Sequence, residues 1–513
     1  MSLKRSLAWM ALAQVCALVL QFAASVVLAR YLTPYETGIY AVALAMVGIL
    51  ALMQALGLQS LIVREENLNT EIRTTAFTVN ACICVLLSIG IAAISLFGGS
   101  FLHDEGVQKA ILALAVTPLF GIFAFLPSAE LERSGSFQTL ALVGIAGNIA
   151  GTIATITLAI HGFSYMSIAY AQWVTVGVQA LVLNIIGYRY ASYRLGYKAW
   201  RRVGHFGLQM FAVSSITSLS MRLSDIMLGR LLGLGTLGIY NRASGLNGLI
   251  WNNIHVVIAR VVFVDFAALH RRGIPLRERY LRILAIMTAT LWPAFAGLGI
   301  LARPFIMTVY GERWLPAAFP LLLIAVGSMI KVGISMTWEV FAVMGELRAQ
   351  TRIVCTRVAL SFPIFLAACT VSINAAAAAT IVEALLAFVL YAPYLNRMTK
   401  TSLGDFLPIY ARSALVTILA ITPAVFVMIS FQMSADIPRM LEGAAVVGGL
   451  LLWTGGLFFV KHPLADELFG TLHRLWSLLN QKPDQESQSS HETVARENHR
   501  LLPSAVSSDS REQ

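Results

Sequence analysis

The sequence predicts an all-α, polytopic membrane protein of about fourteen transmembrane helices, arranged as two pseudosymmetric six-helix lobes plus two C-terminal helices. Composition is the first observation behind this prediction. Of 513 residues, 58% are hydrophobic and only 12% are charged, which is too apolar for a soluble globular domain. The second observation is that the apolar residues form continuous runs of roughly 20, long enough to cross a bilayer, without the period-two alternation of a barrel strand.

The third observation is an internal repeat. The segment LARYLTPYETGIY, from Leu28 to Tyr40, recurs as LGRLLGLGTLGIY, from Leu228 to Tyr240. Duplicated transmembrane modules are common in transporters, whose halves move against each other around a central site. Because each half would hold an even number of crossings, we expect the two halves to be related by a rotation about an axis near the membrane normal.

The expected helices follow the apolar runs in order. The first follows Lys4 and Arg5 and is longer than the apolar part of a signal peptide, so we expect it to be uncleaved. The first six lie near residues 7–29, 38–58, 76–96, 107–125, 137–160 and 165–186. The next six lie near residues 206–229, 237–261, 280–301, 317–341, 353–371 and 375–394, and the last two near 408–430 and 440–460.

These runs divide the chain into an N-terminal lobe (1–187), a basic cytoplasmic linker (188–205), a C-terminal lobe (206–396) and helices 13 and 14 (397–461). In residues 462–481, apolar side chains recur at helical spacing, which predicts an amphipathic helix on the membrane surface. Residues 482–513 are rich in Gln, Ser and Glu and predict a disordered cytoplasmic tail.

Lysine and arginine in the short loops predict the orientation. With a cytoplasmic N-terminus, the basic clusters near 189–202 and 271–279 face the cytoplasm, as the positive-inside rule requires. Fewer basic residues, among them Arg30, Arg230 and Arg242, then lie toward the outside. The net charge of +11 follows from this topology and from contact with anionic membrane lipids, so no nucleic-acid partner is expected. Both termini are expected in the cytoplasm. The five cysteines lie in apolar runs and indicate no metal site, and no cofactor is expected.

Ionisable residues inside the predicted helices are the candidates for a functional site, because charges in a membrane are costly and usually functional. Lys331 has no opposite charge within one helical turn and could meet a phosphate in a cavity or pair with another helix. Arg222 and Asp225 are three residues apart and could neutralise each other or take part in substrate binding or gating. Arg357 could bind substrate or extend to the cytoplasmic interface. Glu383, like Asp225, could carry a coupling proton, or it could pair with an arginine.

The repeated Arg30, Gly38, Arg230 and Gly238 suggest a structural motif. Each arginine ends an apolar helix and is expected to bind the C-terminal carbonyls of that helix. Each glycine is expected to let the next helix pack closely.

Three segments together are similar to a known family. ARYLTPYETGIY, LGRLLGLGTLGIYNRA and PFIMTVYGERWLPAAFPLLLIA, which begin at Ala29, Leu228 and Pro304, resemble the polysaccharide transporter family of lipid-linked oligosaccharide flippases. That family belongs to the multidrug, oligosaccharidyl-lipid and polysaccharide exporter superfamily. The similarity extends from Met1 to about Val460. One departure is Val264 in VVFVDF, where the family often has proline.

The resemblance implies a V-shaped protein of two six-helix lobes around a central cavity. Its implied function is to flip undecaprenyl-diphosphate-linked oligosaccharide repeat units across the bacterial inner membrane, by alternating access, for exopolysaccharide, capsule or O-antigen synthesis. The lipid-linked oligosaccharide, membrane lipids, a polysaccharide polymerase and chain-length machinery are the expected partners. Lys331, Arg222, Asp225 and Arg357 would line the substrate cavity.

Other functions remain open from the sequence. A drug or cation antiporter, or a peptidoglycan-precursor flippase, of the same superfamily would share the architecture. A membrane polysaccharide polymerase or ligase is a candidate from a different class. Such an enzyme normally has a sizeable polar loop for its acceptor and catalytic groups, whereas every outward loop expected here is short.

Overall fold

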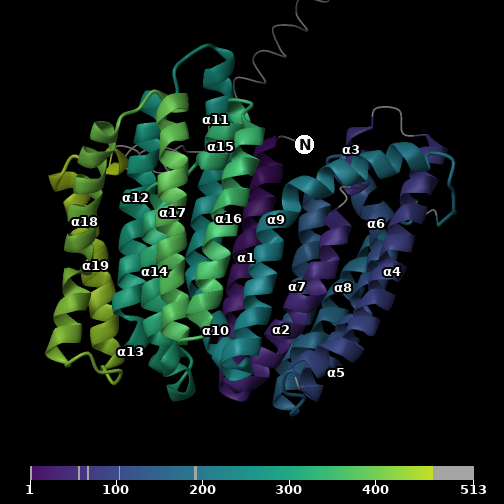
Figure 1. The fold of residues 1–513 in the computed structure, drawn as a ribbon, viewed down its shortest axis with the longest axis horizontal. Coiled ribbons are helices and arrows are strands. Elements are labelled where there is room, and N and C mark those ends of the chain that lie inside the picture. Colours follow the sequence, from purple (N-terminus) through teal and green to yellow (C-terminus); the bar gives the residue numbers. More distant parts are fainter. Residues whose placement is uncertain (1–2, 56–57, 66–68, 103, 190–192, 466–513) are drawn as a thin grey trace, which may run out of the picture. The chain divides into compact units, whose positions relative to one another are not determined.

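The computed structural model of the chain is built from α-helices joined by short 3-10 and π segments, and its described residues contain no strand (Figure 1). The described residues are 3–55, 58–65, 69–102, 104–189 and 193–465. They fall into two compact units, 1–456 and 457–513, of which the second is described only to residue 465. The expected surface helix and tail therefore lie almost wholly outside the described residues.

The described residues of the first half form eight α-helices and one 3-10 turn. These are α1 (Leu3–Tyr31), α2 (Pro34–Ala51), η1 (Leu52–Ala55), α3 (Leu58–Arg64), α4 (Thr70–Leu102), α5 (Glu105–Leu114), α6 (Thr117–Arg133), α7 (Phe137–Ile160) and α8 (Met166–Ile186). The expected second and fourth helices are thus interrupted rather than continuous. In the fourth, Pro118 stands in the first turn of α6, where proline is favoured because its missing N–H is not needed.

The second half has the same general plan. Its elements are α9 (Trp200–Leu232), α10 (Leu234–Ile250), the π turn η2 (Trp251–His255), α11 (Val256–Arg271), α12 (Arg277–Ile300), α13 (Ala302–Val309), the 3-10 segment η3 (Glu312–Ala317), α14 (Ala318–Val332), α15 (Thr337–Val343), α16 (Leu347–Cys369) and α17 (Ile373–Thr399). Two further helices follow, α18 (Leu403–Ser430) and α19 (Arg439–Phe459).

The expectation of one continuous helix over residues 317–341 was wrong. The helix stops at Val332 and resumes at Thr337, and between them Met336 has a φ of 63°. A bulky residue in the left-handed region marks a real break in the helical path. Lys331 therefore lies in the last turn of α14 and not near the middle of a long helix.

Twelve helical segments of the described chain are long and apolar enough to cross a membrane, two fewer than expected. The described residues of α9 and of α10 with α11, where the seventh and eighth crossings are expected, contain no such segment. Both regions are helical, but they carry polar residues such as Arg222, Asp225, Asn241 and Arg242. Helices that face a polar cavity have a lower mean hydropathy than helices that face only lipid.

The two halves meet through the repeated segment itself. Helices α2 and α10 lie side by side (Figure 1). A Cβ atom added to Gly38 would lie 1.8 Å from the carbonyl oxygen of Leu234, and one added to Gly238 would lie 1.9 Å from that of Pro34. Each glycine thus meets the residue four positions before the other glycine, and reciprocity of this kind is the mark of a two-fold relation.

Packing away from this contact follows the same symmetry. Helix α1 packs on α7 as α9 packs on α16, and α7 packs on α8 as α16 packs on α17. The two halves therefore repeat both a sequence signature and an arrangement of helices. The region around α2 and α10 is where side chains from both halves come together.

Candidate functional site

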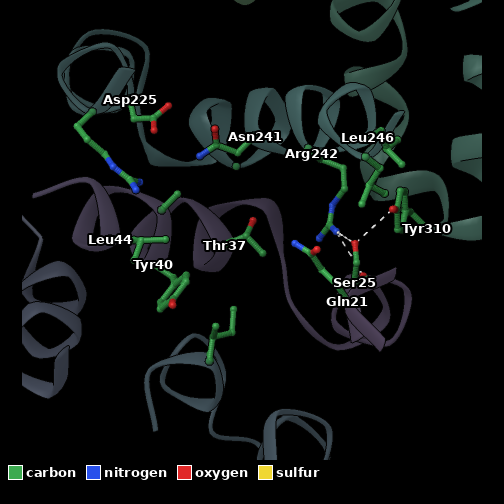
Figure 2. Close-up of a pocket in the computed structure, with 16 residues that line it drawn as sticks. Gln21, Ser25, Thr37, Tyr40, Leu44, Asp225, Asn241, Arg242, Leu246 and Tyr310 are labelled. Atoms are coloured by element: carbon green, nitrogen blue, oxygen red, sulfur yellow. Dashed lines mark hydrogen bonds between the residues drawn. The ribbon is translucent and has the colours of Figure 1, made fainter. Parts of the chain in front are cut away.

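A cavity of about 270 Å³ lies between the two halves, and we call it the central cavity (Figure 2). Helices α1, α2 and α8 line it from the first half, and α9, α10 and the residue that follows α13 line it from the second. Its polar lining consists of Gln21, Ser25, Thr37, Tyr40, Arg222, Asp225, Asn241, Arg242 and Tyr310.

One face of α10 supplies the largest share of this lining. Gly238, Asn241, Arg242, Gly245, Leu246 and Leu249 all line the cavity. Their spacing of three and four residues places them along one side of a helix. The helix begins directly after Gly233, whose φ of 91° is a conformation that glycine adopts readily.

Arg242 is held in what we call the arginine clamp, formed with Ser25, Tyr310 and Trp314. Its guanidinium carbon lies 4.3 Å from the centroid of the Trp314 ring and 4.6 Å from that of Tyr310. Its Nη1 donates to the hydroxyl of Ser25 at 2.6 Å and to the backbone oxygen of Ser25 at 3.3 Å. Stacking on aromatic faces stabilises a guanidinium without neutralising it. The Nε atom of Arg242 is buried and has no hydrogen-bond partner.

Hydrogen bonds next to the clamp join the C-terminal end of α1 to the second half. Trp314 is fully buried, and its Nε1 donates to the carbonyl oxygen of Ala29 at 2.9 Å. Nearby, Arg30 donates to the carbonyl oxygens of Thr308 at 3.0 Å and Val309 at 3.4 Å. The expectation that Arg30 binds the carbonyls of its own helix is therefore corrected, because it binds the C-terminal end of α13. Its repeat equivalent, Arg230, is exposed.

Arg222 and Asp225 reach the central cavity from α9. Neither forms a hydrogen bond or a salt bridge within 4.0 Å with any described residue. The two charges are still close enough to interact electrostatically. Arg222 lies against α2 where that helix has Gly48, since a Cβ atom there would lie 2.6 Å from the Nε of Arg222. Gly48 thus leaves the space that the arginine side chain occupies.

Lys331, Arg357 and Glu383 form a separate group, which we call the charge triad. The Nζ of Lys331 lies 3.0 Å from Glu383 Oε2, and the Nη1 of Arg357 lies 2.9 Å from Glu383 Oε1. Lys331 is therefore not the unpaired ammonium that its sequence neighbours suggested. The triad joins α14, α16 and α17, and none of its members lines the central cavity.

Sequence reasoning missed the residues of the clamp. It assigned Arg242 to the outward-facing basic residues, whereas the structure places Arg242 inside α10 at the cavity. A comparison of the two copies of the repeat could have indicated Arg242. Ala41 and Val42 of the first copy become Asn241 and Arg242 in the second, so polarity enters at two adjacent positions of an otherwise matching segment.

Comparison with known proteins places the chain in a family. The sequence profile of the family described as "Polysaccharide biosynthesis protein" matches residues 27–319, more than half of the chain. The chain is 26% identical over 335 residues to the lipopolysaccharide biosynthesis protein WzxC of Escherichia coli K12, a match that covers 63% of this chain and 67% of that protein. It is 25% identical over 332 residues to the succinoglycan biosynthesis transport protein ExoT of Rhizobium meliloti, covering 62% and 64%.

Solved structures show the same fold. An inward-facing multidrug resistance transporter of the MATE family, in the MOP superfamily, matches with a TM-score of 0.56 and 16% identity, covering 75% of this chain and 96% of that one. A MOP superfamily transporter from Pyrococcus furiosus matches with a TM-score of 0.52 and 16% identity, covering 78% and 97%. The chain thus belongs to the polysaccharide biosynthesis protein family and is a multi-pass membrane protein with the fold of these transporters.

Proposed function

We propose that this protein is a flippase that moves undecaprenyl-diphosphate-linked oligosaccharide repeat units across the bacterial inner membrane by alternating access, for exopolysaccharide, capsule or O-antigen synthesis. One observation carries the proposal. The central cavity is lined by both halves and holds two arginines, Arg222 and Arg242, that form no ion pair with a described residue. The relatives named for lipopolysaccharide and succinoglycan biosynthesis support the same substrate class.

A diphosphate suits this lining for electrostatic reasons. An arginine in a membrane protein is costly unless its charge is compensated, and a phosphate can accept two parallel hydrogen bonds from one guanidinium. Arg222, Arg242 and Asp225 together leave a net charge of about one positive unit in the cavity lining. A bound diphosphate would compensate that charge, whereas a cationic drug would be repelled by it.

Alternating access requires the two halves to separate on one side of the cavity and approach on the other. The arginine clamp and the contact of Gly38 with Leu234 hold the halves together near the C-terminal end of α1 and the N-terminal ends of α2 and α10. We assign these contacts to a gate. Because Arg242 belongs to the clamp and to the cavity lining, a phosphate that bound its guanidinium would compete with Ser25 for the same donor.

The charge triad has a different proposed role. Glu383 already accepts from two cations, and protonating it would leave Lys331 and Arg357 facing each other without a counter-charge. We therefore assign the triad to structure and assign proton coupling to Asp225, which faces the cavity and has no direct partner among the described residues.

Reconstitution tests the proposal. The full chain is purified into liposomes containing a fluorescent undecaprenyl-diphosphate-linked oligosaccharide, and exposure of the glycan to an external glycosidase is followed over time. Wild-type protein should expose the inner-leaflet pool, while Arg222→Ala and Arg242→Ala should slow this at least about tenfold, equivalent to 1.4 kcal/mol.

Arg348→Ala is the matched control, because Arg348 is an exposed arginine of α16 outside the cavity lining. It should transport as the wild type does. If wild-type protein moves no lipid-linked glycan, the proposal is wrong. Transport of ethidium by the same vesicles would then favour the cation antiporter.

A further inference from the structure

A second cavity, of about 760 Å³, lies within the first half, and we call it the amide cavity. Residues of α2, η1 and helices α3 to α6 and α8 line it. Its volume is within the roughly 300–1,000 Å³ typical of small-molecule sites. Five side-chain amides belong to the lining: Gln54, Gln59, Asn80, Gln172 and Gln179. Among the described residues, no Asp, Glu, Lys, Arg or His lines this cavity.

Two of these amides have no partner in the described part of the chain. Gln172 and Gln179 are seven residues apart on α8, with Val176 between them on the same face. Neither side chain forms a hydrogen bond with a described residue. An amide left without hydrogen bonds in an apolar environment costs about 1–3 kcal/mol. Their positions in a membrane-spanning helix therefore require water or a ligand in the cavity.

A third amide is fixed in place. The Nε2 of Gln59 donates to Glu132 at 2.6 Å and to the hydroxyl of Ser128 at 3.2 Å. These bonds use both of its N–H donors and leave its carbonyl oxygen for another group. The cavity thus combines one oriented acceptor with two amides that can both donate and accept.

The chemistry of the lining matches a neutral sugar. Hydroxyl groups donate and accept hydrogen bonds, and so do side-chain amides. Phe120, Phe125 and Tyr40 also line the cavity and offer apolar surface to the faces of a sugar ring. A carboxylate or phosphate would lose its hydration there without meeting a cation of the described lining, which is costly. An acyl chain would leave the amides unsatisfied for the same reason.

The position of the amide cavity links it to the diphosphate site. Tyr40 and Leu44 of α2 line both cavities, so the two adjoin along that helix. We propose that the amide cavity binds the uncharged sugars of the glycan next to the lipid diphosphate, while Arg222 and Arg242 hold the diphosphate in the central cavity. This inference rests on the proposed function, and it separates recognition of the glycan from recognition of the lipid carrier.

Binding measurements with two lipids test the inference. The full chain in nanodiscs is titrated with undecaprenyl diphosphate and with undecaprenyl-diphosphate-linked N-acetylglucosamine, using intrinsic tryptophan fluorescence. Gln172→Leu and Gln179→Leu should each raise the Kd for the sugar-linked lipid at least about tenfold. Their Kd for sugar-free undecaprenyl diphosphate should stay within about twofold of the wild-type value.

Gln108→Leu is the matched control, because Gln108 lies on α5 and lines neither cavity. It should bind both lipids as the wild type does. Replacing glutamine with leucine in a membrane helix favours insertion, so folding is not expected to fail, and size-exclusion profiles check this. Gln179→Asn, which keeps the amide, should retain part of the sugar-dependent affinity.

A charge substitution sharpens the test. Wild-type protein should bind the N-acetylglucosamine lipid more tightly than the glucuronic acid lipid, and Gln179→Arg should reverse that preference by pairing with the added carboxylate. The inference would be overturned if the leucine variants lost affinity equally for the sugar-linked and the sugar-free lipid. It would also be overturned if they lost affinity for neither. If the leucine variants bind undecaprenyl diphosphate more tightly than the wild type does, the cavity is an acyl-chain site instead.

These outcomes are distinct from failure of the proposed function. If wild-type vesicles do not flip the lipid-linked glycan, the flippase proposal fails whatever the binding ratios are. If they do flip it while Gln172→Leu and Gln179→Leu bind and transport normally, only the sugar site is wrong.

Discussion

Two groups of charged side chains lie within the helices of this protein, and they differ in whether their cations bond to a carboxylate. In the charge triad, Glu383 bonds to Lys331 and to Arg357 across three helices. At the central cavity, Arg222 and Arg242 have no carboxylate within ion-pair distance in the described residues. Each cation of the triad thus bonds to a carboxylate, whereas neither cavity arginine bonds to one in the described part of the chain.

This difference shows that charge inside a membrane helix does not by itself mark a binding site. A cation whose counter-charge comes from another helix stabilises the packing of those helices. A cation held by aromatic faces and hydroxyls, as Arg242 is by Trp314, Tyr310 and Ser25, keeps its net charge available to an anion. The two groups should therefore respond to substitution in opposite ways.

The largest effect on stability is expected from Glu383→Gln. Removing the carboxylate leaves two part-buried cations without their counter-charge. Breaking a fully buried pair in this way costs about 3–5 kcal/mol, and the part-buried triad should lose less than that. Thermal unfolding in detergent should show a large drop in Tm and a loss of folded protein. The triple variant Lys331→Met, Arg357→Met, Glu383→Leu should recover the fold and still transport. A stable Glu383→Gln variant without transport would instead make the triad part of the site.

The next largest effect is expected at the arginine clamp, and it should fall on transport. Arg242→Lys keeps the charge but lacks the planar group that stacks between two rings, so its initial transport rate in liposomes should lie between those of wild type and Arg242→Ala. Trp314→Phe keeps a stacked ring but loses the bond to Ala29, a net change of about 1 kcal/mol. It also leaves a cavity at a fully buried position, which adds to the loss of stability. If Arg242→Ala transports at the wild-type rate, Arg242 has no role in the cavity.

An intermediate effect is expected from Asp225→Asn. If Asp225 carries the coupling proton, the amide cannot, so transport should no longer respond to an imposed pH gradient while passive equilibration continues. Transport measured with and without a gradient checks this in the same liposomes. If the Asp225→Asn variant still responds to the pH gradient, Asp225 does not carry the coupling proton.

The smallest effect is expected from Arg30→Ala. Arg30 is exposed and belongs to neither charged group, and it donates to the carbonyl oxygens at the end of α13. Losing such bonds costs about 0.5–1.5 kcal/mol, so a modest fall in Tm with normal transport is expected. If Arg30→Ala lost transport at an unchanged Tm, Arg30 would have a role in transport like that of the cavity arginines.

Much of the fold could be predicted from the sequence, because the information is local. Continuous apolar runs indicated a polytopic helical protein, and the match to solved structures confirms an all-helical membrane fold. The repeated glycines predicted close helix packing, since a missing Cβ matters wherever two backbones approach, and the structure shows that the helices concerned belong to different halves. The resemblance of three short segments to the polysaccharide transporter family agrees with the family match.

The tertiary structure alone decided which charges belong together. Lys331 and Glu383 are 52 residues apart, and Ser25 and Arg242 are 217 residues apart, so no spacing rule could pair them. The break before Thr337 and the position of Arg242 inside α10 also depend on packing between distant helices. Hydropathy determines which segments enter the membrane, because it sums over neighbours in the chain. Whether a charge is paired or left facing a cavity depends on neighbours in space.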